Sequence, residues 1–111
     1  MTILLFEDNL MWSVRLRKQL EFSGHTVVVL KSLPAELPSA DAAIVNLGSA
    51  AFQSGGLIGR LRSTGIRTVG HAGHKEKDLH EAGLSEGVDL NVTNRELSER
   101  AAEVITRLMT A

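Results

Sequence analysis

The chain has 111 residues, enough for one hydrophobic core but not for two, so the sequence predicts a single domain over 1–111. A net charge of -1 gives no bulk attraction to nucleic acid or to an anionic membrane, and no apolar run reaches membrane-span length. The absence of cysteine excludes disulfides, thiolate nucleophiles and cysteine metal sites, and it fits a cytoplasmic protein.

The first part of the chain alternates between strand and helix patterns. Residues 2–6 are a continuous apolar run of strand length, as expected for a strand buried on both faces of a sheet. Residues 9–23 carry apolar side chains at helical spacing and end at Gly24, and residues 26–30 form a second, β-branched strand. The next segment, 32–40, holds both prolines, so a helix there is limited to one or two turns, or is absent.

The second part of the chain continues the alternation. Three further strands and two helices are expected, the strands at 42–47, 66–70 and 88–92 and the helices at 55–63 and 75–86. Thr93 and Glu96 have the spacing of a capping box and predict the start of a last helix. This alternation indicates an α/β fold, with a five-stranded parallel sheet, helices on both faces and right-handed crossovers.

Polar residues follow these strands at the end where each strand stops. Glu7 and Asp8 follow the first strand, Asn46 closes the third, and His71 and Asn94 follow the fourth and fifth. Because the carboxyl ends of parallel strands meet at one edge of a sheet, and such edges carry the chemistry of α/β domains, we expect these five side chains to lie together.

Several segments resemble, in order and spacing, the receiver domain of two-component response regulators. LLFEDNLMWSVRLRKQLEFSGHTVVVL resembles the opening of a receiver, with an acidic pair and Asn after the first strand. DAAIVNL resembles the phosphoacceptor strand, GGLIGRLRSTGIRTVGHA the third helix and fourth strand, and AGLSEGVDLNV the approach to the fifth strand. The resemblance covers nearly the whole chain, and it implies a flavodoxin-like (βα)5 fold and a role in signalling.

The resemblance also implies which residues would carry phosphoryl transfer, and most of them are absent. Asn46 stands at the position of the phosphoacceptor aspartate, and its neutral amide cannot attack phosphorus. His71 stands where the family has a hydroxyl residue, Asn94 where it has a lysine, and Asn91 where it has an aromatic switch residue. We therefore expect a degenerate pseudo-receiver that works without phosphorylation.

The magnesium site of the family is expected to be weakened here. The resemblance assigns the ion to Glu7, Asp8, the phosphoacceptor and the carbonyl of Gly48, and Asn46 removes one negative charge from that set. Magnesium prefers hard anionic oxygens, so binding should be weak or absent, and no other cofactor is expected. Without a cation, repulsion between Glu7 and Asp8 should raise the pKa of one carboxyl.

Two other classes of function stay open at this point. Glu7 and Asp8 could join His71, His74 and His80 in a small-ligand or metal-sensing site, because imidazole and carboxylate together suit transition metals. An enzyme on the same scaffold is the weakest interpretation, since the sequence has no triad or acid/base pair specific enough to support it.

The expected partner is a protein of a signalling pathway, with a weak homodimer possible. One candidate surface is the start of the first helix, where Leu10, Met11 and Trp12 offer apolar area. The other is the last helix, which the resemblance implies as a pairing face and where Arg95 and Arg100 belong to an array of both charge signs. Opposite charges at helical spacing can also pair within one helix.

Overall fold

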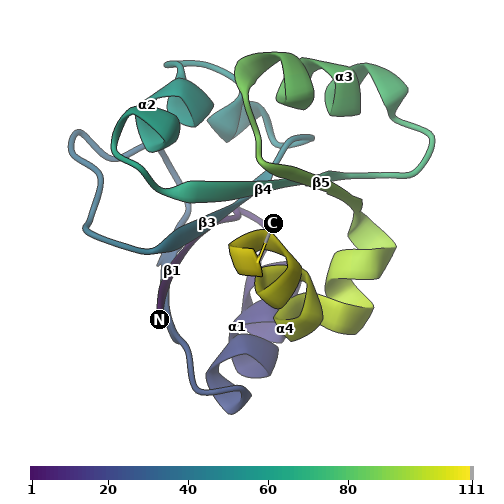
Figure 1. Cartoon of the computed structure of the whole chain (residues 1–111). Coiled ribbons are helices and arrows are strands. Elements are labelled where there is room, and N and C mark those ends of the chain that lie inside the picture. The colour runs from purple at the N-terminus through teal and green to yellow at the C-terminus, as the bar shows by residue number, and fades with distance from the viewer. Residues whose placement is uncertain (111) are drawn as a thin grey trace.

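The computed structural model describes residues 1–110, and over this range one parallel sheet lies between two layers of helices (Figure 1). The elements in chain order are β1 (Thr2–Phe6), α1 (Leu10–Phe22), β2 (Thr26–Leu30), β3 (Ala42–Asn46), the 3-10 helix η1 (Ala50–Phe52), α2 (Leu57–Ser63), β4 (Arg67–Ala72), α3 (Lys77–Glu86), β5 (Leu90–Thr93) and α4 (Asn94–Thr110). The strand order is β2-β1-β3-β4-β5, and all neighbouring strands are parallel. The predicted flavodoxin-like fold is confirmed.

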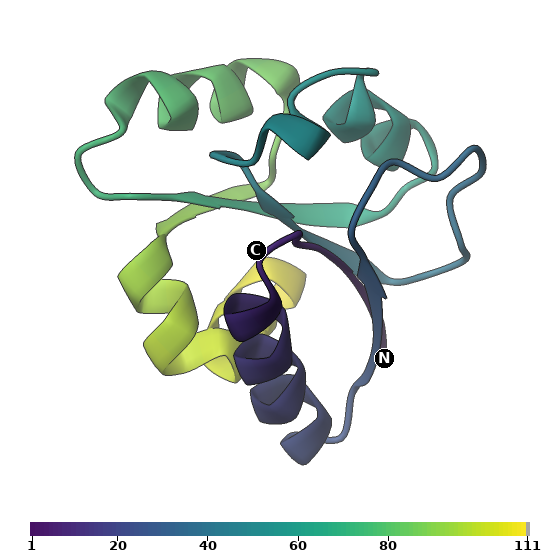
Figure 2. The ribbon, with the colours of Figure 1, turned by 180° about the vertical axis from the view of Figure 1, so that it is seen from behind.

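The two layers of helices cover opposite faces of the sheet. In Figures 1 and 2, α1 and α4 lie on one face, and η1, α2 and α3 lie on the other. No helix within residues 1–110 is long and apolar enough to cross a membrane.

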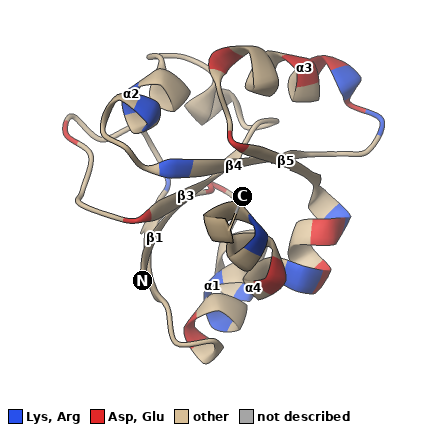
Figure 3. Ribbon diagram, viewed as in Figure 1, with Lys and Arg blue, Asp and Glu red and all other residues tan. Residues whose placement is uncertain are grey.

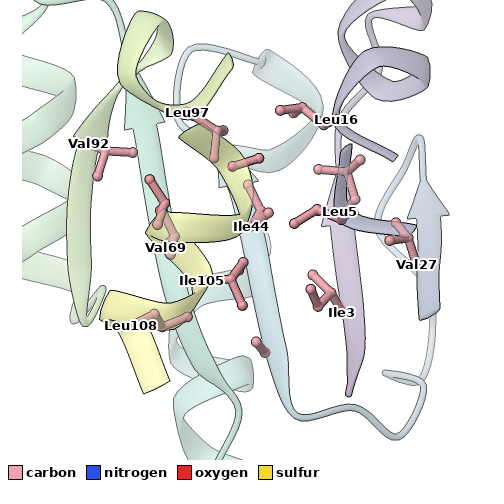
Figure 4. Packing of buried hydrophobic residues seen from close by; sticks show 14 residues of the cluster. Ile3, Leu5, Leu16, Val27, Ile44, Val69, Val92, Leu97, Ile105 and Leu108 are labelled. Carbon is pink, nitrogen blue, oxygen red and sulfur yellow. The ribbon is translucent and has the colours of Figure 1, made fainter. Parts of the chain in front are cut away.

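Alternate residues of each strand enter different cores, which explains why the strands are apolar throughout. In β1, Leu5 faces α1 and α4, where it joins Leu16 and Ile105 in one buried cluster (Figure 4). Phe6 faces the other way and meets Phe52 of η1 edge-on, with ring centroids 5.7 Å apart, in a second cluster. A parallel sheet with both faces covered requires apolar side chains on both faces of each central strand.

The proline-bearing segment between β2 and β3 forms no helix in the described chain. Of the two outcomes that the sequence allowed, a short helix or none, the structure has none. Pro38 has no N–H to donate, and Pro34 restricts the residue before it, so helical hydrogen bonds cannot continue through the segment. Arg60 of α2 supplies donors instead, because its Nη2 lies 3.0 Å from the carbonyl oxygens of both Pro34 and Ala35.

Several element boundaries differ from those predicted. β4 runs to Ala72 instead of ending at residue 70, so His71 lies inside the sheet. α2 begins at Leu57 because Gly55 and Gly56 have φ angles of 75° and 62°, which are outside the right-handed helical region. β5 begins two residues later than expected, α3 begins at residue 77 instead of 75, and η1 was not predicted.

The last helix begins as predicted but is not one straight helix. The Thr93 hydroxyl accepts the N–H of Glu96 at 3.1 Å, which caps the start of α4. Arg100 has non-helical angles, φ -140° and ψ 43°, so α4 consists of two helical segments that meet at a kink. Beside the kink, Gln19 of α1 donates from Nε2 to the carbonyl of Ser98 at 2.6 Å.

Candidate functional site

The strand order brings the polar strand ends together. β3 lies between β1 and β4, and Asn46 is in register with His71 of β4. Phe6 is in register with Val45, so Glu7, the next residue after β1, lies beside Asn46. Asn94 begins α4 directly after β5. We call the four side chains of Glu7, Asn46, His71 and Asn94 the strand-end network.

Asn46 and Glu7 are joined by two hydrogen bonds in this network. The Asn46 Nδ2 group donates to both carboxyl oxygens of Glu7, at 3.1 Å to Oε1 and 2.9 Å to Oε2. The backbone N–H of Asn9, the N-cap of α1, donates to the same Oε2 at 3.2 Å. The Asn46 Oδ1 accepts the N–H of Gly48 at 3.0 Å. Glu7 is fully buried, so these N–H groups replace water around its carboxyl group.

His71 joins the network from β4. Its Nδ1 is hydrogen-bonded to Asn94 Oδ1 at 2.7 Å, and its Nε2 lies 3.6 Å from Glu7 Oε1. The ring is buried, and within residues 1–110 its Nε2 has no hydrogen-bond partner. With Nδ1–H donating to Asn94, a neutral ring directs the Nε2 lone pair toward Glu7.

Burial shifts both ionisable groups of the network toward their neutral forms. Burial raises the pKa of the Glu7 carboxyl, although the hydrogen bonds from Asn46 and Asn9 oppose that rise. Burial lowers the pKa of His71 to about 4, with the bond to Asn94 acting in the opposite direction. The charge of Asp8 also raises the pKa of Glu7, but less than burial does. The predicted repulsion between Glu7 and Asp8 therefore raises the pKa of Glu7 as expected, but it contributes less to that rise than burial does.

Asp8 does not take part in the network. Its side chain is exposed and makes no hydrogen bond or ion pair within the described part of the chain. The expectation that five side chains lie together therefore holds for four of them.

A second polar contact, between Asn91 and His80, was missed by the sequence reasoning. Asn91 Nδ2 donates to the His80 carbonyl at 2.9 Å, and its Oδ1 is hydrogen-bonded to His80 Nδ1. The other ring nitrogen of His80 is bonded to the carbonyl of Gly73 at 3.0 Å. These bonds hold α3 against β5, and no local sequence signal connects two residues eleven positions apart on different elements.

The donor set fits a metal ion poorly. Both oxygens of Glu7 already accept hydrogen bonds from N–H groups. Glu7 is buried whereas Asp8 is exposed, so the two carboxyl groups do not form one ligand set. The metal-sensing interpretation is not supported either, because both ring nitrogens of His80 are already hydrogen-bonded within the chain. Over residues 1–110, no group of three or more His, Asp or Glu side chains could hold a metal.

Some of the residues predicted for protein contacts are exposed, and others contact side chains of the chain itself. Leu10 and Met11 are 63% and 83% exposed, whereas Trp12 is partly buried against the core that faces α1 and α4. Arg95 pairs with Glu99 within α4 at 3.0 Å, as the intrahelical interpretation predicts. Arg100 is exposed at the kink.

The sequence of the chain matches no family profile and no curated protein, but solved structures share its fold. A response regulator receiver protein from Burkholderia phymatum is 13% identical, with a TM-score of 0.79 over 98% of this chain and 94% of that one. The receiver domain of NtrX from Brucella abortus is 15% identical, with a TM-score of 0.78 over 98% of both chains. HP1043, an orphan response regulator of H. pylori, is 19% identical, with a TM-score of 0.75 over 97% and 96%. The chain has the receiver fold.

Proposed function

We propose that this chain is a receiver-type regulatory module that works through protein contacts and without phosphorylation. It is a pseudo-receiver, a cytoplasmic signalling protein with no enzymatic activity of its own and no role in binding nucleic acid or membranes. The receiver fold supports the regulatory role. The main observation in favour of function without phosphorylation is the pair of hydrogen bonds between Asn46 and Glu7.

Residue 46 stands at the nucleophile position of a receiver. A receiver is phosphorylated on a carboxylate at the end of β3, and the residue there is Asn46. Its amide nitrogen already donates to Glu7 and its amide oxygen already accepts the N–H of Gly48. A neutral amide held at both ends has neither the charge nor the freedom to attack phosphorus.

The surrounding residues support the same conclusion. A phosphoryl group needs cationic partners, and Asn94 provides a neutral amide that is bonded to His71. Asn91, at the position of the aromatic switch, is neither aromatic nor apolar, and both ends of its amide are hydrogen-bonded to His80. Magnesium would have to displace N–H donors from Glu7, which supports weak or absent binding.

Acyl phosphorylation tests this proposal directly. The chain is incubated with acetyl phosphate and Mg²⁺, and intact mass spectrometry measures phosphoryl addition, with an active receiver domain treated in parallel. We expect no mass gain for this chain. A gain of one phosphoryl group that hydroxylamine removes would overturn the proposal, because hydroxylamine cleaves acyl phosphates.

A thermal-shift screen separates this proposal from the ligand-sensing interpretation. Divalent metals, nucleotides and the phosphate analogue beryllofluoride are added singly, and the melting temperature is recorded. We expect no shift with any of them. A saturable rise that Asn46→Ala abolishes would contradict the proposal, because it would show a ligand bound at the strand-end network.

A further inference from the structure

The helix α3 buries few of its own side chains. Gly83 is its one buried residue, and Leu79 is partly buried against the core that faces α2 and α3. A hollow of about 250 Å³ lies between α3 and α2, lined by Leu79 and Ala82 on one side and by Leu47 and Ile58 on the other. An element with so few buried apolar contacts opens locally more easily than the rest of a domain.

Three hydrogen bonds of the His80 residue join α3 to its surroundings. Asn91 of β5 donates from Nδ2 to the backbone carbonyl of His80 at 2.9 Å, and its Oδ1 is bonded to the ring Nδ1. The ring Nε2 is bonded to the carbonyl of Gly73, in the turn before α3, at 3.0 Å. We call these three hydrogen bonds the His80 clamp.

The partners in the His80 clamp fix where the protons of the ring lie. The backbone carbonyl of His80 can only accept, so the Asn91 amide nitrogen must face it and the amide oxygen must face Nδ1. The carbonyl of Gly73, which faces Nε2, can also only accept. A neutral imidazole has one N–H group, whereas the imidazolium has two. The clamp is therefore complete only when both ring nitrogens of His80 carry a proton.

No carboxylate pairs with this ring. Within residues 1–110 the ring forms no ion pair, and β5 carries no charged residue (Figure 3). The carboxyl of Glu76, beside the turn, accepts the N–H of Gly73 at 3.2 Å. The other charged side chains on α3 and on the elements packed against it are Lys77, Asp78, Glu81, Glu86, Arg60, Arg62 and Arg67.

The titratable group on the neighbouring strand β4 is His71. Burial is the main cause of its lowered pKa, and the charge of His80 lowers that pKa further. Of the two histidines, His80 is the one whose contacts favour the charged ring, because both of its nitrogens face oxygen acceptors. The proton therefore resides on His80 while His71 stays neutral.

We propose that a proton on His80 switches α3 between a clamped and a loosened state. In the clamped state the doubly protonated ring donates to both Gly73 and Asn91. When the ring loses one proton, one nitrogen presents a lone pair to a carbonyl oxygen, so that hydrogen bond is lost. Imidazole is the side chain that gains and loses a proton between about pH 5 and pH 8, which suits it to such a switch.

The two ends of α3 accommodate this change. Gly87, directly after the helix, has a φ angle of 109°, and the turn at Gly73 precedes it. Loosening α3 widens the hollow toward α2 and changes the surface that the helix presents. The chain then responds to protons, and this response goes beyond the proposed function because it involves neither residue 46 nor phosphate.

Hydrogen exchange of the α3 amides from about pH 5.5 to about pH 8 tests the switch. The rates are expressed as protection factors, which removes the intrinsic pH dependence of exchange. We expect the protection of α3 in the parent chain to fall about tenfold as the pH rises, the size expected for one lost hydrogen bond to a charged group. Amides of α4, on the other face of the sheet, should show no fall.

Two histidine variants assign the fall to one ring. His80→Gln has no group that titrates at this position, so the protection of α3 should stay constant with pH. His74→Gln is the matched control, because His74 lies in the turn before the same helix, is exposed, and forms no side-chain hydrogen bond within residues 1–110. This variant should show the same tenfold fall as the parent.

Asn91→Ala tests the donor count while the titrating ring is kept. It leaves Gly73 as the single acceptor, which a neutral ring satisfies from Nε2, so α3 should be less protected at pH 5.5 and the fall with pH should disappear.

Constant protection of α3 in the parent chain would overturn the proposal, whether or not the variants fold. So would a fall that persists in His80→Gln or disappears in His74→Gln. None of these results bears on acetyl phosphate, so this proposal and the proposed function fail separately.

Discussion

The strand-end network and the surface where the end of α1 meets the kink of α4 differ in how their polar groups are satisfied. In the strand-end network, Glu7 is fully buried, and the amide of Asn46 donates to both of its carboxyl oxygens. On the surface between α1 and α4, Lys18 and Glu103 are exposed and form no side-chain hydrogen bond or ion pair with the described residues. The first region is closed by contacts within the chain, and the second is open to contacts from outside.

This difference shows which region depends on contacts within the chain. A buried polar group is costly unless it is hydrogen-bonded, so the network is stable only while its own side chains satisfy one another. Exposed charges are satisfied by water and can exchange water for a partner at little cost.

The largest effect should come from putting a carboxylate back into the network. Asn46→Asp removes the two N–H donors from Glu7 and places a second negative charge beside the buried carboxyl of Glu7. We expect a loss of about 3 kcal/mol in the free energy of unfolding at neutral pH, measured by urea denaturation. The loss should shrink on acidification, when one carboxyl takes up a proton, and on addition of Mg²⁺.

Asn46→Ala is the control for that experiment, because it removes the donors and adds no charge. It should cost less than Asn46→Asp and should not respond to Mg²⁺. An Asn46→Asp variant as stable as the parent at neutral pH would show that the network is more open to water than its burial indicates.

A smaller effect should come from the titration of His71. Its pKa is about 4 in the folded chain and 6.5 in the unfolded chain, so the unfolded state binds more protons between these values and stability is lost as the pH falls through them. From about pH 7 to about pH 5 this loss is about 2 kcal/mol. His71→Gln should lose less over the same range in urea denaturation at each pH.

Glu7 acts in the opposite direction, which makes the comparison sharper. The pKa of Glu7 in the folded chain is raised above its ordinary value of 4.5, so the folded state binds more protons just above pH 4.5. The contribution of Glu7 to stability therefore falls as the pH rises from 4.5 through the folded pKa. In His71→Gln only this opposing trend remains, and the pH profile should become flat or change slope. A His71→Gln profile parallel to that of the parent would show that His71 is not buried in its neutral form.

The smallest effect should come from Asp8, at the border between the buried network and solvent. Asp8 is exposed, and its charge raises the pKa of Glu7, so Asp8→Asn should leave the free energy of unfolding within about 0.5 kcal/mol of the parent or raise it slightly. Urea denaturation at neutral pH measures this difference. A clear loss would mean that Asp8 holds a ligand or a capping contact.

The sequence predicted the elements that depend on local pattern. The capping spacing of Thr93 and Glu96 marks the start of α4, and the apolar run at residues 2–6 marks a strand buried on both faces. The positions of Glu7, Asn46, His71 and Asn94 near the carboxyl edge of the sheet also follow from the alternation of strands and helices, because parallel strands share that edge. The Asn9 N-cap could have been predicted too, from an asparagine directly before a helix.

The contacts between elements could not be predicted in the same way. The sequence offers His80 as a metal ligand as readily as the partner of Asn91, and only the packing of α3 on β5 decides between them. No proline or glycine in α4 predicts the kink at Arg100, and the kink lies where α1 contacts α4 through Gln19 and Ser98.

The sequence by itself determined the fold and the neutral amide that ends the third strand, because periodicity and the identity of residue 46 are properties of single positions and their near neighbours. Only the tertiary structure decided that Asn46 is hydrogen-bonded to Glu7, that His71 is buried in a neutral form, and that Phe22 is exposed at the end of α1. Burial and hydrogen bonding across elements depend on which surfaces meet, and that is a property of the packed chain as a whole.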